Sequence, residues 1–252
     1  MKTTFVDLET AKATPGLRLV TVAGAPSPWS EAAKAIFHFK KVPFVAVRRL
    51  ARDEAMQAWT SGPNAPVALF DAETPRSGWA DILALAERLA PAASLVPSNP
   101  GDRVRMYGLA NEVLGEGGLV WSFRALTIAE GLASEGVRGF SVPVARYLAK
   151  RYVDSPERTA RASARVVEAL DLLARALGDK TFYFGDAPTA LDFYSAAALH
   201  LLSLMPEEKC PMDARLRAAF ESMASVSPPV ALALAAHRDL MLERYFEMPL
   251  VL

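Results

Sequence analysis

The chain has 252 residues, enough for one large or two medium-sized domains, and its 52% hydrophobic and 22% charged residues are typical of a folded globular protein rather than a disordered one. Its 28 lysines and arginines balance its 28 aspartates and glutamates, which argues against a nucleic-acid-binding surface or a basic membrane-binding face and favours a small neutral or amphiphilic partner. The single cysteine, Cys210, excludes an intramolecular disulfide and fits a reducing compartment.

The first third of the chain predicts a small domain of alternating strands and helices. Residues 1–16 lack a signal-peptide core, and no run in the chain approaches the roughly 18 apolar residues of a membrane helix, so we interpret 1–16 as an N-terminal extension of a cytoplasmic protein. Residues 17–90 then alternate between strand and helix patterns. We expect strands at 17–23, 43–48 and 67–70 with a short fourth near 75–76, and helices at 29–41, in the polar stretch up to 59, and at 79–89. This order is typical of a thioredoxin-like α/β domain.

The remainder of the chain predicts a second domain made only of helices. Residues 91–101 contain three prolines and a glycine, so neither a helix nor a strand can run through them, and we interpret 91–102 as a linker. In the domain from 103 to 252 the apolar residues recur at helical spacing, most clearly where Val166, Leu170 and Leu173 share one face. The expected helices cover residues 103–116, 119–133, 142–152, 156–177, 190–203, 213–224 and 229–245.

The segment 184–192, Phe-Gly-Asp-Ala-Pro-Thr-Ala-Leu-Asp, predicts a well-specified helix start. Thr189 is placed to cap the helix that follows, and Asp192 to accept a hydrogen bond from the Thr189 amide, as in a capping box. An apolar run that reads as a buried helix comes next. The whole string resembles the one at the centre of the C-terminal domain of glutathione S-transferases. The resemblance covers roughly residues 17–245 and implies a thioredoxin-like glutathione-binding domain at 17–90.

The junction of the first strand and helix, residues 24–30, reads Gly-Ala-Pro-Ser-Pro-Trp-Ser. It resembles the active-site segment of plant and bacterial cytosolic members that use a serine hydroxyl, which implies a catalytic role for Ser27 and a glutathione contact for Trp29. Lowering a thiol pKa from about 8.5 to about 6.5 requires roughly 2.7 kcal/mol and raises the thiolate fraction at pH 7 from roughly 3% to roughly 75%. A hydroxyl donor and a helix N-terminus together supply an effect of that size. Ser30 is the alternative catalytic residue, and both serines also fit a purely capping role.

Two further segments match the family's glutathione site in different degrees. Ala65-Pro66 before a strand resembles the loop with a cis proline, whose preceding residue pairs its backbone with the cysteinyl unit of glutathione. Arg76-Ser77-Gly78 stands where family members usually carry Glu-Ser or Gln-Ser. Ser77 and the helix amides still suit a carboxylate, and Arg76 would attract that carboxylate but repel the glutathione amine. Glutathione then binds in an altered way, or Asp81 or an acid of a second subunit replaces the missing glutamate, or another anionic thiol binds.

Other residues have less specific interpretations. Met106, Tyr107 and Trp121, with Phe123, lie on the two helices that line the hydrophobic-substrate pocket in this family, although each also suits core packing. The scattered histidines lack the spacing of a metal site, and we expect no metal. The cysteine is expected to be an incidental thiol, and the glycines at 115–118 a helix break. The histidines are His38, His200 and His237.

The resemblance therefore implies a glutathione transferase that uses glutathione as its co-substrate and attacks a small hydrophobic electrophile, and it implies a homodimer. Two alternatives remain. A non-catalytic binding module of the same fold is favoured by the altered segment around Arg76. A glutathione-dependent lyase, dehalogenase or isomerase shares the thiol site and differs in its second substrate.

Overall fold

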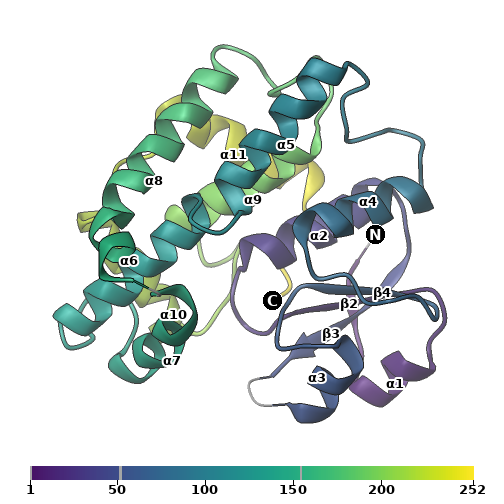
Figure 1. The fold of residues 1–252 in the computed structure, drawn as a ribbon, viewed down its shortest axis with the longest axis horizontal. Helices are drawn as coiled ribbons and strands as arrows, with labels where there is room; N and C mark the ends of the chain where they lie inside the picture. The colour runs from purple at the N-terminus through teal and green to yellow at the C-terminus, as the bar shows by residue number, and fades with distance from the viewer. Residues whose placement is uncertain (1, 51–52, 154) are drawn as a thin grey trace.

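The computed structural model describes residues 2–50, 53–153 and 155–252. A small sheet with its covering helices lies beside a larger group of helices (Figure 1). The fold class predicted from the sequence, a thioredoxin-like α/β domain followed by an all-α domain, is confirmed. No helix in the described parts of the chain is both long and apolar enough to cross a membrane.

The sheet has four strands in the order β1-β3-β2-β4. β2 (Leu17–Val22) runs parallel to β3 (Phe44–Arg49), and β4 (Val67–Phe70) runs antiparallel to β2. The register pairs Val22 with Arg49 and Val20 with Val67. The carboxyl ends of β2 and β3 and the amino end of β4 therefore meet at one edge of the sheet.

Helices cover both faces of the sheet because successive side chains of each strand point to opposite sides. Leu17 and Leu19 pack with α2 (Pro28–Phe39) and α4 (Trp79–Leu89). Val20 and Val47 pack on the other side, where α1 (Leu8–Ala13) and α3 (Glu54–Thr60) lie. Because both faces are covered, β2 is buried at nearly every position, its polar residues Arg18 and Thr21 included.

The sheet differs from the sequence expectation at both of its edges. Residues 1–16, expected as an extension, contain α1 and the two-residue strand β1 (Thr4–Phe5), which pairs in parallel with β3. Two residues carry no detectable period, so the sequence gives no strand signal there. The expected fourth strand near 75–76 is a single bridge between Arg76 and Ala68. The helical part begins at Pro100, inside the segment expected as a linker.

The helical domain follows the predicted periodicity closely, and α8 has the predicted bounds. Its members are α5 (Pro100–Leu114), α6 (Leu119–Ala133), α7 (Val142–Tyr152), α8 (Pro156–Leu177), α9 (Ala190–Leu202), α10 (Ala214–Glu221), the 3₁₀ turn η1 (Ser222–Ser225) and α11 (Leu232–Tyr245). α9 is buried along its whole length, as its apolar sequence predicts, and α5, α11 and α2 pack around it.

The predicted capping box is present at the start of α9. Asp192 is fully buried, and its Oδ2 accepts hydrogen bonds from the Thr189 amide at 2.7 Å and the Thr189 hydroxyl at 2.8 Å. Its Oδ1 lies 3.0 Å from the Tyr183 amide and 2.9 Å from His237 Nε2. One carboxylate thus joins the turn before α9, the first turn of α9 and α11.

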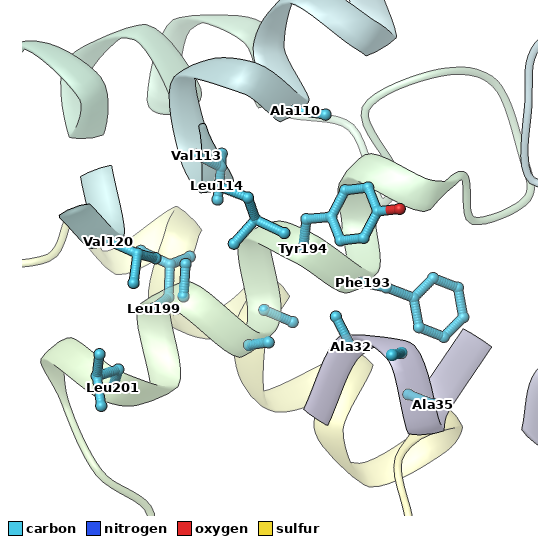
Figure 2. Packing of buried hydrophobic residues seen from close by; sticks show 14 of the residues in the cluster. Ala32, Ala35, Ala110, Val113, Leu114, Val120, Phe193, Tyr194, Leu199 and Leu201 are labelled. Carbon is cyan, nitrogen blue, oxygen red and sulfur yellow. The ribbon is translucent and has the colours of Figure 1, made fainter. Parts of the chain in front are cut away.

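α2 and α9 form the main contact between the two parts of the molecule. Figure 2 shows Ala32 and Ala35 of α2 lying opposite Phe193 of α9, with small side chains on one helix facing a large ring on the other. The indole nitrogen of Trp29, at the start of α2, donates to the Leu114 carbonyl at 2.9 Å. The start and the middle of α2 therefore connect the α/β part to the helical domain.

Candidate functional site

A cavity of about 530 Å³ opens at the sheet edge where β2, β3 and β4 meet. One wall belongs to the α/β part and the other to α5, α6 and α7. The α/β wall consists of Val22, Trp29, Arg49, Leu50, Gln57, Pro63, Asn64, Ala65, Pro66 and Ser77. The helical wall consists of Leu114, Trp121, Arg124, Tyr147, Leu148, Lys150, Arg151 and Tyr152. Its position outside the carboxyl ends of parallel strands is a common one for ligand sites in α/β folds.

The two candidate serines have different surroundings. Ser27 is the N-cap residue of α2 and is almost fully buried, and its hydroxyl makes no capping bond. It lies in the chain between the cavity-lining residues Val22 and Trp29 but does not itself line the cavity. Ser30 is fully buried, and its hydroxyl accepts from the Val22 amide at 3.2 Å. The Ser30 hydroxyl thus links α2 to β2 by a hydrogen bond, whereas the Ser27 hydroxyl makes no hydrogen bond to the described residues and is called uncommitted below.

The loop before β4 has the predicted conformation. The Ala65–Pro66 peptide bond is cis, and both residues line the cavity directly below the end of β2. Because β4 pairs antiparallel to β2, with Val67 opposite Val20, the residues that precede Val67 lie at the sheet edge where β2 ends. Ala65 therefore lines the same cavity as Val22 and Trp29.

The segment before α4 is only partly directed to the cavity. Ser77 is exposed and lines it. Arg76 does not, because its guanidinium binds Glu73 at 2.7 Å and its backbone pairs with Ala68. The hydrogen bonds from Arg76 and then Arg88 lower the pKa of Glu73. Arg76 is thus held by its own ion pair and does not face a ligand.

The N-terminus of α4 carries its own acid. Gly78 is the N-cap of α4, and a Cβ added there would lie 2.7 Å from Asp81 Oδ2. The Asp81 carboxylate therefore folds back over the helix start, directly after Ser77. Asp81 is exposed and lies close to the segment in which this sequence lacks the glutamate that the family resemblance implies.

Of the three candidate pocket residues of the helical domain, one lines the cavity and two do not. Met106 is fully buried in the core, and Tyr107 packs on Trp79 with ring centroids 6.2 Å apart, so neither lines the cavity. Phe123 is also a core residue. Trp121 does line the cavity, and its ring lies 4.7 Å from that of Tyr152. Burial at helical spacing therefore accounts for most of these aromatic and sulfur-containing side chains.

Comparisons with known proteins give a consistent result. Residues 156–227 match the sequence model of the glutathione S-transferase C-terminal domain. Among solved structures, a glutathione S-transferase from Methylobacterium radiotolerans in complex with glutathione sulfonate is 20% identical, with a TM-score of 0.57 over 90% of this chain and 91% of that one. A family member from Pseudomonas fluorescens with two glutathione bound is 12% identical, with a TM-score of 0.59 over 91% of this chain and 89% of that one.

A third solved structure is a bacterial maleyl pyruvate isomerase of the zeta class, 17% identical with a TM-score of 0.53 over 87% of this chain and 95% of that one. No curated protein sequence matches the chain. The chain has the glutathione S-transferase fold, and residues 156–227 resemble the C-terminal domain of that family.

Within this glutathione S-transferase fold, the charged residues of the cavity were not predicted from the sequence. The cations Arg49 on β3, Arg124 on α6, and Lys150 and Arg151 on α7 line it, and among the residues that the structure describes no acidic side chain does. Burial lowers the pKa of the Arg124 guanidinium. The equal numbers of acids and bases in the whole chain conceal this local excess, because the four residues come from three separate elements.

The histidines and the cysteine of this glutathione S-transferase-type chain lie away from the cavity. The described residues contain no group of three or more His, Cys, Asp or Glu side chains that is arranged to hold a metal ion. His237 belongs to the Asp192 network, and His38 stacks on Phe44 with ring centroids 5.0 Å apart. Cys210 is buried, and burial raises the pKa of its thiol to about 11. A thiol of this kind is not a nucleophile at neutral pH.

Proposed function

We propose that the protein is a glutathione transferase that activates the glutathione thiol for attack on an electrophile. The observation that carries the proposal is the cavity itself, in which Ala65, Pro66 and Ser77 on one wall face a separate helical wall. A two-walled cavity suits two substrates, with glutathione along the α/β wall and the electrophile against α6 and α7. Solved proteins of the same fold, described as having glutathione bound, support glutathione as the first substrate.

In this proposal the chain's own groups have distinct tasks. The uncommitted Ser27 hydroxyl at the N-terminus of α2 donates to the thiolate sulfur, and the first amides of α2 add a partial positive charge. The Ala65 backbone holds the cysteinyl unit. Ser77 binds the γ-glutamyl carboxylate at the start of α4, and Asp81 accepts from the γ-glutamyl amine. We further expect a homodimer, which sedimentation velocity at micromolar concentration tests.

These tasks lead to a direct test by thermal denaturation. Glutathione at about 10 mM is expected to raise the melting temperature of the wild-type protein, because it binds the folded state preferentially. Ser27→Ala is expected to retain that shift but to lose most of the turnover of 1-chloro-2,4-dinitrobenzene. The control is Ser98→Ala, which removes a hydroxyl from an exposed position between the two parts of the chain. The absence of both a thermal shift and turnover in the wild-type protein would refute the proposal.

One observation favours a second candidate, a non-catalytic binding module. Arg76 stands where the family resemblance implies a glutamate or glutamine, and its ion pair with Glu73 keeps it out of the cavity. A binding module would show the glutathione-induced thermal shift without turnover of any electrophile. If wild-type turnover is present and Ser27→Ala retains it, thiol activation instead belongs to the α2 amides.

A further inference from the structure

The helical wall of the cavity carries a local positive charge with no compensating acid. Arg124 projects from the middle of α6, and Lys150 and Arg151 from the last turn of α7. Lys150 and Arg151 are exposed, whereas Arg124 is partly buried. None of the three forms an ion pair with a carboxylate in the part of the chain that the structure describes.

A neighbouring cavity shows that this arrangement is local. It has a volume of about 430 Å³, shares Trp121 and Tyr152 with the first cavity, and is also lined by arginines. There, however, Glu157 and Glu168 line the same walls, and Arg165 binds Glu168 at 3.0 Å. Acids thus stand among the arginines of the smaller cavity, whereas no acid of the described residues lines the first cavity.

Several hydrogen-bond donors of the first cavity also lack partners. Arg124 Nε, Trp121 Nε1 and Arg49 Nη1 are buried atoms without an acceptor among the described residues. A buried donor without an acceptor costs about 1–3 kcal/mol, and more when it is charged. The Arg124 guanidinium carbon lies 5.2 Å from the centre of the Tyr152 ring, a contact that offsets part of this cost. The guanidinium of Arg151 lies 5.6 Å from the same ring. Two like charges thus flank one aromatic ring.

Glutathione does not account for these groups on the helical wall. In the arrangement proposed above, one of its carboxylates meets Ser77 at the start of α4. Arg49, at the end of β3 on the same α/β wall, is available for the other. Arg124 and Arg151 project from the opposite wall, where the second substrate would bind. They therefore leave room for one further anionic group, next to the flat surface made by Trp121 and Tyr152.

We propose that the second substrate is an organic carboxylate with a flat aromatic or conjugated part, whose carboxylate binds Arg124 and Arg151 while its flat part packs on Trp121 and Tyr152. This inference rests on the proposed function for the identity of the first substrate. It changes the expected co-substrate from a neutral hydrophobic electrophile to an anionic one. Arginine suits this task because its planar donors match the two oxygens of a carboxylate.

Two matched ligands test the charge preference without glutathione. Binding of 4-nitrobenzoate and of its neutral isostere 4-nitrobenzamide is measured by calorimetry on the full chain. The acid is expected to bind at least about tenfold more tightly than the amide, and the difference is expected to shrink as salt is raised. Equal affinity of the wild-type protein for the acid and the amide overturns the proposal, whether or not glutathione binds.

Variants then test the residues. Arg124→Met and Arg151→Met are each expected to weaken binding of the acid by about tenfold and to leave the amide unchanged. Arg146→Met is the control, because Arg146 is an exposed arginine of α7 that lines neither cavity. If Arg124→Met does not fold, Arg151→Met and the wild-type ligand pair decide. Unchanged acid binding in Arg151→Met, or an equal loss in Arg146→Met, overturns the assignment.

A kinetic comparison separates this inference from the proposed function. With glutathione present, 4-chloro-3-nitrobenzoate is expected to have a KM at least about tenfold below that of 4-chloro-3-nitrobenzamide, and Arg151→Met to abolish the difference. Turnover of both compounds with equal KM keeps the glutathione transferase and refutes the anionic subsite. Tight binding of the acid without any glutathione-dependent turnover keeps the subsite and refutes the transferase.

Discussion

Removal of the Asp192 carboxylate is expected to be among the most damaging single changes outside the large apolar core. The carboxylate is fully buried and accepts from the Thr189 amide, the Thr189 hydroxyl, the Tyr183 amide and His237 Nε2, at distances of 2.7, 2.8, 3.0 and 2.9 Å. Asp192→Ala leaves two buried amides and a buried imidazole without an acceptor. At about 1–3 kcal/mol for each buried donor, and allowing for relaxation, we expect a loss of about 4 kcal/mol of unfolding free energy.

The measurement is urea-induced unfolding followed by circular dichroism, together with thermal denaturation. A loss of about 4 kcal/mol corresponds to a fall of about 8–16 °C in the melting temperature of a chain of this length. Asp192→Asn is expected to lose nearly as much stability, because the amide NH₂ group is a donor and would replace a carboxylate oxygen that accepts hydrogen bonds. The control is Asp186→Ala, an exposed position in the preceding turn, with an expected change within about 0.5 kcal/mol. A loss below about 1 kcal/mol in Asp192→Ala would refute the reasoning.

Three further predictions concern individual buried groups. Ser30→Ala leaves the Val22 amide without its acceptor, so we expect a loss of about 1–2 kcal/mol of unfolding free energy, measured in urea. Turnover per folded molecule is expected to stay unchanged, and a loss of turnover without a loss of stability would contradict this structural role. Burial, and then two nearby arginines, lower the pKa of His200 to about 3, so the unfolded chain binds a proton that the folded chain does not. The free energy of unfolding is therefore expected to fall as pH decreases from about 6.5 towards 3, by up to about 1 kcal/mol per pH unit. His200→Leu is expected to make this pH dependence shallower, and an unchanged pH dependence in that variant would contradict the role of His200. The buried thiol of Cys210 is expected to resist an aromatic disulfide reagent at pH 8 in the native protein and to react fully in urea, and fast native labelling would contradict its burial.

The fold was predictable from sequence wherever the signal is periodic or local. α8 has a strict apolar stripe and begins after a Ser-Pro cap, and its predicted and observed bounds coincide. The start of α9 is specified by a few adjacent residues. The N-terminal strand was not predictable, because its two residues, Thr4 and Phe5, are held by pairing with β3 and not by any pattern of their own. A strand whose stability comes from its neighbour leaves little trace in its own sequence.

The site was predictable only in part. Ala65, Pro66 and Ser77 line the cavity, as the family resemblance implies, because short segments next to strands carry their own motifs. Met106 and Tyr107 were ambiguous, since helical spacing gives the same letters for a core residue and a pocket residue. The positive charge of Arg124, Lys150 and Arg151 on the helical wall was not predictable from any sequence motif, because these residues come from separate helices. A sequence records which residues are charged but not which of them remain without a partner.

The position of α2 connects these features physically. One end of α2 carries the uncommitted Ser27 hydroxyl and the Trp29 indole, which donates to the Leu114 carbonyl on the opposite wall of the cavity. Its middle packs against α4 within the α/β part and against α9 within the helical part. The packing of α2 on α9 therefore joins the two parts whose residues form the cavity walls, and Asp192 holds the start of α9.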